Sequence, residues 1–322
     1  MSRKRFGDWA RWEVVRQLDE GGQGWIYEVR DTSGTLSQPL VLKRLKNRTR
    51  LDRFRREIEA HQRLNHSGIA SLIDFSLDDP PFLVAPLYEG PTLEQIAPLE
   101  PLRALDLFLK LCDVVQYAHN EGVFHRDLKP SNVILNKDEK DVIVIDFGLC
   151  YFVDEDERLT ETTEQIGSRY YIAPELEGGR ANEVTSAADV YGLGKTLYFL
   201  LTGKHVAREA ITGENDLVHL TGNRQLKYVA DRILRKSIAV DAEQRSSVES
   251  LSESAKIIHR LIREHYYPGP DREGALCRFC GEGSYEKGPP MSIAMRMAGT
   301  SGDFVCKTLV CSSCKHVEWF RT

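Results

Sequence analysis

Long hydrophobic runs are missing from this sequence of 322 residues. No apolar stretch approaches the roughly 18 residues that a helix needs to cross a bilayer. Residues 1–12 are basic and aromatic, and they lack the apolar centre of a secretory signal. We therefore expect no membrane segment, no signal peptide and a cytoplasmic location.

Charge of one sign is not in large excess either. The formal net charge is −5, and hydrophobic and charged residues make up 41% and 28% of the chain, as in ordinary globular proteins. This balance argues against a strongly electrostatic binder of nucleic acid, although it leaves room for a local patch. The length allows one large domain with a small module, or two ordinary domains.

Cysteine is scarce in most of the chain and concentrated near its C-terminal end. Cys112 and Cys150 are expected to be packing thiols in a reducing compartment. The other five of the seven cysteines lie at or after Cys277, beyond a linker at residues 266–270 that contains Pro and Gly. This clustering predicts a separate C-terminal module.

Two CxxC pairs in this module predict a zinc site. Cys277 and Cys280 form one pair, and Cys311 and Cys314 form the other. Each pair lets two thiolates approach one ion, and four thiolates complete the tetrahedral shell of structural Zn²⁺. A small zinc ribbon fits this pattern, with a disulfide scaffold and a redox CxxC as the alternatives. Cys306 is expected to be a bystander.

The charges of the module bear on its partner. From Pro268 to Thr322 there are seven Lys and Arg residues and six Asp and Glu residues. This balance disfavours nucleic acid and favours a contact with protein or docking on the rest of the chain.

The stretch from His125 to Gly148, HRDLKPSNVILNKDEKDVIVIDFG, is best suited to catalysis. Asp127 follows an apolar, helix-like run, and Asn132 comes five residues later. Two apolar runs around a polar turn predict a β-hairpin that brings Asp146 to the same cleft. Two carboxylates and an amide suit a Mg²⁺-bound phosphate and a hydroxyl nucleophile, because Mg²⁺ prefers oxygen ligands.

This stretch resembles the catalytic core of protein kinases, in which HRDLKPSN is followed by DFG. The resemblance covers roughly residues 13–266 and implies that ATP, Mg²⁺ and a protein with Ser or Thr acceptors are the ligands. It implies that Asp127 deprotonates the acceptor hydroxyl and that Lys129 stabilises the γ-phosphate and favours Ser/Thr over Tyr chemistry. Asn132 and Asp146 are then the residues that hold Mg²⁺.

The N-terminal part resembles the nucleotide-binding elements of the same family. A glycine-rich turn lies between two strand-like runs, a short strand ends in a lysine, and a helical run has an acidic residue beside its buried stripe. A plain hairpin turn, a solvated lysine and an exposed acid are the alternatives. The resemblance assigns Gly21, Gly24 and Ile26 to the glycine-rich loop, Lys43 to the α- and β-phosphates, and Glu57 to an ion pair with Lys43.

Two residues of the N-terminal part depart from the family pattern. Asp19 replaces the first glycine of the loop, where an acid is expected to stiffen the loop or weaken nucleotide binding. His61 lies one helical turn after Glu57, where the family usually has an aliphatic residue against the DFG phenylalanine. We interpret His61 as a hydrogen-bonded core histidine rather than a pH sensor.

Residues 82–88 resemble the strand and hinge that bind adenine in kinases. Pro86 keeps the carbonyl that accepts from adenine, and Tyr88 supplies the N–H donor. Ala85 takes the gatekeeper position, and its small side chain predicts an extra pocket behind adenine.

The stretch DEDERLTETTE after DFG is acidic and rich in threonine, which predicts an exposed loop. One interpretation is a solvated loop. The other is an activation segment in which a phosphorylated threonine binds Arg126 and Arg53. The candidate acceptors are Thr160, Thr162 and Thr163.

Further residues match the larger lobe of the family. Glu175 and Arg245 resemble the ion pair that holds the APE segment. Asp189 is expected to accept hydrogen bonds from the backbone of the catalytic loop. Ser168 takes the place of a threonine that braces Asp127.

We predict an α+β, two-lobed protein kinase fold, with a β-rich N-lobe and a mainly helical C-lobe, plus a small β-rich zinc ribbon. The predicted domains are an N-terminal extension, the kinase domain and a four-cysteine zinc ribbon, at residues 1–12, 13–267 and 268–322. Within the kinase domain, we place the N-lobe, hinge and C-lobe at about residues 13–85, 86–88 and 89–267.

Two other classes of protein remain as alternatives. A pseudokinase scaffold that acts only by binding would be expected to lose Lys43, Asp127 or Asp146, and all three are present. A small-molecule phosphotransferase shares the core chemistry but normally lacks the APE segment and Arg245.

Overall fold

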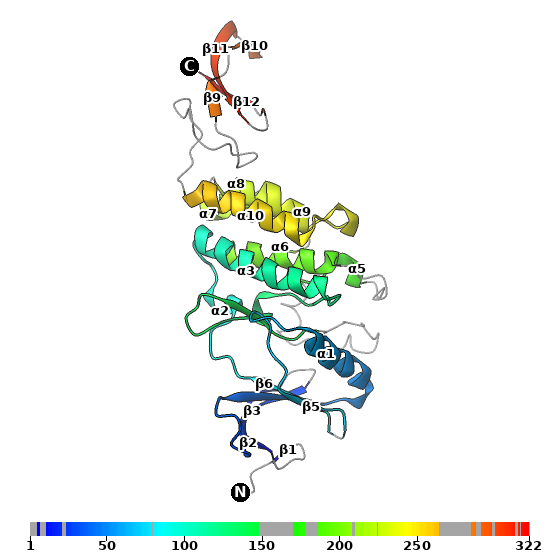
Figure 1. Ribbon diagram of the computed structural model, residues 1–322. Coiled ribbons are helices and arrows are strands. Elements are labelled where there is room, and N and C mark those ends of the chain that lie inside the picture. The colour runs from blue at the N-terminus through cyan, green and yellow to red at the C-terminus, as the bar shows by residue number, and fades with distance from the viewer. Residues whose placement is uncertain are drawn as a thin grey trace. The chain divides into compact units, whose positions relative to one another are not determined.

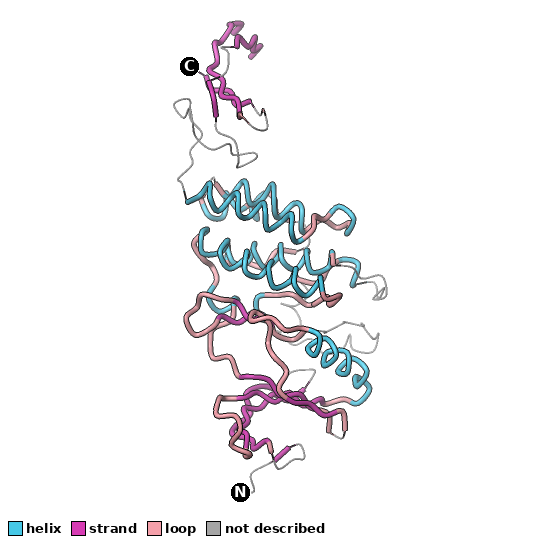
Figure 2. Tube along the Cα trace, in the orientation of Figure 1, coloured by secondary structure: helices cyan, strands magenta, loops and turns pink. Residues whose placement is uncertain are grey.

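The structure is a computed structural model, and it divides into two units, Met1–Ser252 and Glu253–Thr322. Figure 1 and Figure 2 show the helices and strands of each unit. The described residues are 5–6, 11–20, 24–78, 80–147, 170–177, 186–207, 210–223, 225–263, 285–287, 291–297, 300–312, 315 and 317–321.

The first unit begins with a six-stranded antiparallel sheet in the order β1-β2-β3-β4-β6-β5. Side chains of successive residues point to opposite faces of a strand, so alternating apolar residues give the sheet two different faces. Strand β1 extends the sheet edge within a segment that the sequence predicted only as an extension. The strands are β1 (Arg5–Phe6), β2 (Trp12–Glu20), β3 (Gly24–Asp31), β4 (Leu40–Leu45), β5 (Asp74–Ser76) and β6 (Phe82–Pro86).

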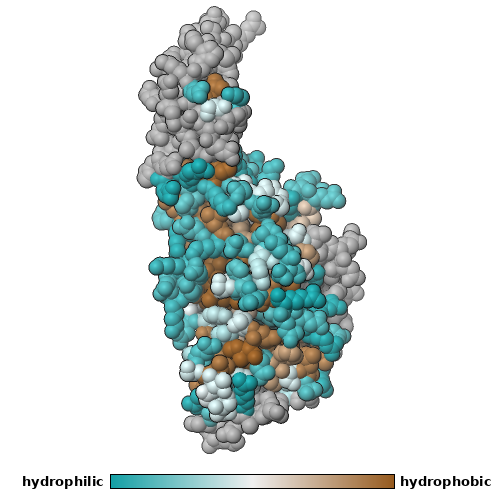
Figure 3. Space-filling view, in the orientation of Figure 1, coloured by the Kyte–Doolittle hydropathy of each residue, from teal (hydrophilic) through white to brown (hydrophobic). Residues whose placement is uncertain are grey.

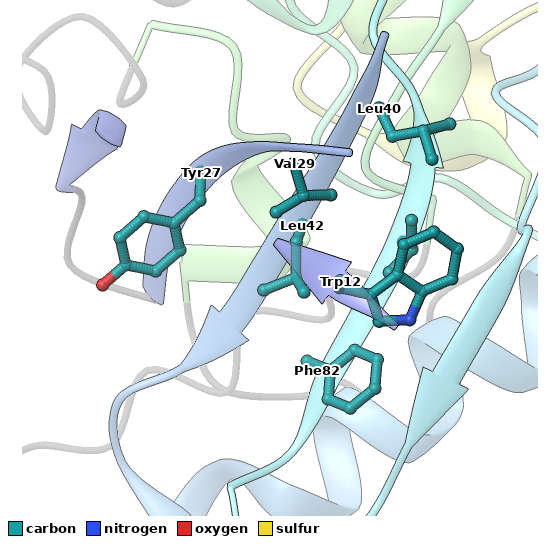
Figure 4. Packing of buried hydrophobic residues seen from close by; sticks show 7 residues of the cluster. Trp12, Tyr27, Val29, Leu40, Leu42 and Phe82 are labelled. Carbon is teal, nitrogen blue, oxygen red and sulfur yellow. The ribbon is translucent and has the colours of Figure 1, made fainter. Parts of the chain in front are cut away.

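One face of this sheet carries an apolar core, shown in Figure 4. Trp12 is 1% exposed, and its indole Nε1 donates a hydrogen bond to Asp74 Oδ2 at 2.8 Å. The bond satisfies a polar group that burial would otherwise leave without a partner. Trp12 lies one residue before the predicted start of the domain, so the core of the sheet includes it. The cluster consists of Trp12, Tyr27, Val29, Leu40, Leu42, Phe82 and Val84.

The other face of the sheet packs against helix α1 (Leu51–Arg63). Phe54 and Ile58 recur at helical spacing and contact Leu45 and Leu83 of the sheet in a second buried cluster. Glu57 lies beside Ile58 on the same helix and is only 2% exposed. Helix α1 therefore places the carboxylate of Glu57 in the interior, next to its apolar face.

A β-hairpin follows the catalytic stretch, as the sequence predicts. Strands β7 (Val133–Leu135) and β8 (Val142–Val144) pair with Val133 opposite Val144. Asn136 Oδ1 accepts from the backbone N–H of Lys140 and Asp141, which closes the turn between the strands.

The remaining helices belong to the first unit, except that the last of them, α10, continues into the second unit. Helix α6 is buried along almost its whole length, and its Gly192 lies so close to the catalytic loop that a Cβ there would be 2.7 Å from the Leu128 carbonyl oxygen. The visible face of this unit is mostly hydrophilic, with groups of apolar residues between polar ones (Figure 3). The helices are α2 (Leu93–Ile96), α3 (Pro101–Asn120), α5 (Pro174–Glu177), α6 (Ala187–Thr202), α7 (Leu217–Thr221), α8 (Leu226–Val229), α9 (Arg235–Ser237) and α10 (Val248–Arg263). Short 3₁₀ turns lie at Arg48–Arg50, Pro130–Asn132, Gly213–Asn215 and Ala242–Gln244, and a π-helical turn lies at Ala230–Leu234.

The second unit contains an antiparallel sheet in the order β10-β11-β12, with β9 also paired to β11. This is the β-rich character that the sequence predicts for the C-terminal module. The boundary between the units falls inside α10, and the predicted domain limits stay predictions. The strands are β9 (Tyr285–Lys287), β10 (Met291–Met297), β11 (Thr300–Cys311) and β12 (Val317–Arg321).

The zinc site stays a prediction as well. Cys277, Cys280 and Cys314 lie outside the described residues, and Cys311 is described only through its backbone, as the last residue of β11. Among the described helices of the chain, none is long and apolar enough to cross a membrane.

Candidate active site

Lys43 connects the N-terminal sheet to two carboxylates. It lies on β4, opposite Ile26 of β3, on the face that packs against α1. Its Nζ is 2.7 Å from Glu57 Oε1 and 3.1 Å from Asp146 Oδ1. The structure thus forms the ion pair between Lys43 and Glu57 that the family resemblance predicts. It adds the carboxylate of Asp146, which follows β8 in the chain.

These three charges depend on one another. Burial by itself would lower the pKa of Lys43, but the carboxylates of Asp146 and Glu57 outweigh this effect and raise it. Burial would likewise raise the pKa of Asp146, but Lys43 outweighs it and lowers it. Lys43 and Asp146 are therefore both ionised at neutral pH, and Lys43 carries its positive charge where phosphates would need it.

Asp127 lies in a polar network within the catalytic loop. Its Oδ2 accepts from Lys129 Nζ at 3.0 Å and from Asn132 Nδ2 at 3.2 Å. The same Asn132 amide donates to the Asp127 backbone carbonyl at 2.9 Å. Because the Asn132 nitrogen is used in this way, its amide oxygen is left to serve as a metal ligand.

A buried carboxylate on α6 fixes the backbone of this loop. Asp189 is 1% exposed and accepts from the backbone N–H of His125 at 2.9 Å and of Arg126 at 2.6 Å. A third bond joins it to His119 Nε2 at 2.8 Å. Burial would raise the pKa of Asp189, but the hydrogen bond and charge of His119 outweigh it and lower the pKa. The loop is thus attached to α6, which is buried along almost its whole length.

His119 is a positioning residue that the sequence reasoning did not identify. It belongs to the last turn of α3, and its side chain is only 7% exposed. The only available signal was a histidine at the end of an apolar helix, six residues before His125. That signal does not identify Asp189, 70 positions further along the chain, as the hydrogen-bond partner of His119.

Phe147 packs between two histidines. Its ring centroid is 4.8 Å from that of His125 and 6.4 Å from that of His61, the second in an edge contact. His125 Nε2 also hydrogen-bonds the carbonyl of Ile145 at 3.0 Å. These contacts hold the chain on both sides of Asp146, whose φ of 58° lies in the left-handed region.

His61 is the core histidine that the sequence indicates. Its Nδ1 is 3.0 Å from the Ala70 carbonyl oxygen, so Nδ1 carries the hydrogen and donates it. Burial lowers the pKa of His61 to about 4, and the Lys43 charge acts in the same direction. The ring is neutral at physiological pH, which agrees with a structural role rather than pH sensing.

The hinge residues continue strand β6. Ala85 lies opposite Val41, and Pro86 lies opposite Leu40 of β4. Tyr88 is half-buried, and its hydroxyl accepts from the Ser71 N–H at 3.5 Å. The adenine contacts and the pocket behind Ala85 stay predictions.

The ion pair expected from Glu175 and Arg245 is present. Two parallel bonds of 2.7 and 2.8 Å join the guanidinium to the carboxylate. Arg245 also donates to the carbonyls of Ala187, Ala239 and Val240. It therefore connects α5 to the start of α6.

Several sequence predictions fall on residues outside the described part of the chain. They concern Gly21 of the glycine-rich loop, Ser168, and the threonines Thr160, Thr162 and Thr163. Gly24 and Ile26, the other loop residues, lie at the start of β3.

Comparisons with known proteins agree on one family. A model of that family, described as "Protein kinase domain", matches residues 12–263. The serine/threonine-protein kinase PknB of Mycolicibacterium smegmatis is 32% identical over 295 residues, which cover 83% of this chain and 45% of that protein. The serine/threonine-protein kinase PkaA of Streptomyces coelicolor is 32% identical over 281 residues, which cover 80% and 51%. The chain thus spans about half the length of these curated relatives.

Solved structures show the same fold. The crystal structure of the Mycobacterium tuberculosis PknI kinase domain matches with a TM-score of 0.60 at 25% identity, over 77% of this chain and 96% of that one. The two-lobed architecture predicted from sequence is confirmed by this match and by the sheet and helices described above.

The low pKa of His61 predicts that acid destabilises the protein. A histidine in the unfolded chain titrates near 6.5, whereas His61 in the folded chain titrates near 4. Between these values the unfolded state binds a proton that the folded state does not, so the free energy of unfolding falls as the pH decreases. His61 alone should contribute a loss of about 3 kcal/mol.

Urea unfolding between pH 7 and pH 4 measures this effect. The variant His61→Leu fills the same space with a side chain that does not titrate. It should therefore lose less stability over that range than the unmodified protein. His219, an exposed histidine on α7, provides the control as His219→Gln, which should follow the unmodified protein. An identical pH dependence in His61→Leu and the unmodified protein would show that His61 does not titrate as described.

Proposed function

Because this chain belongs to the protein kinase family, we propose that it transfers the γ-phosphate of ATP to serine or threonine hydroxyls of proteins, with Mg²⁺. The observation that carries the proposal is the double contact of Lys43 with Glu57 and Asp146. It holds a cation from strand β4 beside a carboxylate that follows the β7–β8 hairpin. PknB and PkaA are both named serine/threonine-protein kinases, which supports serine or threonine, rather than another residue, as the phosphate acceptor.

The side chains of this chain suit the separate tasks of phosphoryl transfer. Lys43 binds the α- and β-phosphates of ATP. Asp127 orients the acceptor hydroxyl and takes its proton, and Lys129, already 3.0 Å from Asp127, offsets charge on the transferred phosphate.

The residues present also fit Mg²⁺. The Asn132 amide oxygen and the Asp146 carboxylate are hard oxygen ligands, and the Asp146 side chain is 33% exposed. Asn132 and Asp146 would hold the ion, and a bound ion would neutralise part of the negative charge of the phosphates.

The two alternative functions fit less well. A pseudokinase would lack part of the set formed by Lys43, Asp127 and Asp146, yet the structure brings all three into hydrogen-bonded networks. A small-molecule phosphotransferase has no need of the Glu175–Arg245 pair, which forms here with two bonds.

Replacement of Asp127 tests the proposed reaction. The variant Asp127→Asn removes the base and retains the phosphate-binding side chains, so turnover should fall by about 10²–10⁴-fold with nearly unchanged ATP affinity. Radiolabelled phosphate transfer to a panel of Ser/Thr peptides measures turnover, and calorimetry measures ATP binding. Asp138→Asn, in the exposed turn of the nearby hairpin, is the control. Full turnover in Asp127→Asn would exclude the proposed mechanism.

We also propose that phosphorylation of the acidic segment after DFG regulates the activity. The support is the position of Arg126, whose backbone N–H is fixed by Asp189 immediately before Asp127. A phosphothreonine that binds this guanidinium would add charge-assisted hydrogen bonds next to the catalytic base.

A triple variant tests this regulation. Replacement of Thr160, Thr162 and Thr163 by Ala should lower activity at least several-fold and remove phosphate from the intact mass. The control Thr212→Ala changes an exposed threonine of the helical half. Activity equal to that of the unmodified protein would mean that these threonines are only part of a solvated loop.

For the C-terminal module we propose a zinc ribbon with four cysteine ligands that contacts protein. The CxxC spacing and the antiparallel sheet of β9 to β12 support it. Thiolate ligands suit the reducing, cytoplasmic location that the sequence predicts. The near balance of charge in residues 268–322 favours a protein over nucleic acid as the partner.

Removal of one ligand tests the zinc site. Apparent folding free energies from structural Zn²⁺ are about 10–16 kcal/mol, so Cys277→Ser should unfold the module. Native mass spectrometry should find one zinc ion in the unmodified protein and none in the variant, with phosphate transfer retained. Cys306→Ser, which removes a thiol outside the CxxC pairs, should keep the zinc. A metal-free unmodified protein or a Cys277–Cys280 disulfide would contradict the ribbon.

A further inference from the structure

An exposed histidine just after helix α6 contacts three aromatic side chains. The His205 ring stacks on Phe199 and on Tyr170, with ring centroids 4.9 and 5.3 Å apart and planes that differ by 21° and 8°. The Tyr171 hydroxyl oxygen lies 3.1 Å from His205 Nδ1, and these two rings also meet edge to face at 5.8 Å. His205 therefore joins the end of α6 to the two tyrosines that precede α5.

The turn that carries His205 is fixed to α6 on both sides. Gly203 ends the helix with a φ of 66°, and its N–H donates to the Phe199 carbonyl at 2.7 Å. On the other side, Lys195 Nζ donates to the Val206 carbonyl at 2.7 Å. Lys195 is 2% exposed, so this bond forms in the interior. The backbone around His205 is thus held in place before any contact with the tyrosines is counted.

The hydroxyl of Tyr171 makes a stable partner for this histidine. Tyr171 is 6% exposed, and burial raises its pKa, so the hydroxyl stays protonated at neutral pH. A hydroxyl both donates and accepts, so Tyr171 can pair with either tautomer of His205. The contact therefore does not depend on which ring nitrogen carries the hydrogen.

Two anchors hold the segment that leads into α5. At its start, His205 contacts Tyr170 and Tyr171. At its end, Arg245 makes two bonds to Glu175. Loss of the His205 contacts would remove the first anchor and leave the ion pair in place.

Helix α6 sets the distance between this histidine and the catalytic loop. Asp189, which binds the loop, and Phe199, which contacts His205, belong to the same helix. With a rise of 1.5 Å per residue, they lie about 15 Å apart along the helix axis. An extended polypeptide covers about 3.3–3.6 Å per residue, so four or five of its residues would span this distance. The residues that flank an acceptor hydroxyl at Asp127 extend over that range.

We propose that His205 is a positioning residue that fixes Tyr170 and Tyr171 for binding of the polypeptide acceptor. The inference rests on the proposed function, because it takes a protein with Ser or Thr as the ligand. A segment that is already held in one conformation loses less conformational entropy when a ligand binds to it. His205 should therefore strengthen acceptor binding. It should leave ATP binding and the chemical step unchanged, because other bonds hold Lys43 and Asp127.

Hydrogen exchange of the full chain, measured by mass spectrometry over residues 170–177, tests the positioning directly. His205→Ala removes both stacking contacts and the hydrogen bond, so exchange in this segment should become at least several-fold faster. Lys204→Ala, at the exposed neighbouring residue, is the matched control and should behave as the unmodified protein. Unchanged exchange in His205→Ala would overturn the positioning role, whether or not the chain is active as a kinase.

Steady-state phosphate transfer to a Ser/Thr peptide tests the effect on the acceptor. In His205→Ala the KM for the peptide should rise about tenfold, as expected for loss of a hydrogen bond and aromatic contacts, with kcat and the KM for ATP unchanged. His205→Phe keeps the stacking and loses the hydrogen bond, whereas His205→Asn keeps a polar group near Nδ1 and loses the ring. Both variants should have intermediate KM values for the peptide.

The outcomes separate the inference from the proposed function. An unchanged peptide KM in His205→Ala would overturn the acceptor role. A lower kcat, or an equal rise in the KM for ATP, would indicate general damage to the helical half and would overturn it as well. If the unmodified protein transfers phosphate to no peptide, the proposed function and the acceptor role fail together, and hydrogen exchange still decides whether His205 holds the segment.

Discussion

The geometry of the catalytic loop depends on the carboxylate of Asp189. Removing a carboxylate from water is costly unless hydrogen bonds replace its hydration, and here three donors do so, from His119, His125 and Arg126. Arg126 has a φ of 66°, a backbone conformation that residues other than glycine rarely adopt. The bond from its N–H to Asp189 stabilises that backbone. The strain is held immediately before Asp127.

A continuous series of contacts leads from this anchor to the other half of the domain. Asn132 bonds Asp127 and begins the hairpin, and the end of the hairpin delivers Asp146 to Lys43. Lys43 then bonds Glu57, whose helix α1 packs on the sheet. The bonds of Lys43 to Asp146 and to Glu57 join residues that are 103 and 14 positions apart in the sequence. A small movement of α1 would therefore separate Glu57 from Lys43 and alter the charge around Asp146.

The sequence predicted the parts of this series that family motifs or local patterns encode. The apolar runs predicted the hairpin, and motif spacing predicted the pairs of Glu57 with Lys43 and of Glu175 with Arg245. Periodicity shows which face of an element is buried but does not identify what covers it. Trp12 and His119 were missed for that reason, since their partners Asp74 and Asp189 lie 62 and 70 positions away.

The departures at Asp19 and His61 from the family pattern are each compensated inside the structure. Asp19 accepts the N–H of its neighbour, and His61 donates to Ala70 while its ring meets Phe147. A buried polar group without a partner costs about 1–3 kcal/mol, whereas one with a partner costs far less. Histidine can therefore replace an aliphatic residue beside Phe147 without displacing Asp146 from Lys43. For this reason the departures do not favour a kinase fold without activity: they alter neighbours of the catalytic groups and leave the bonds among those groups in place.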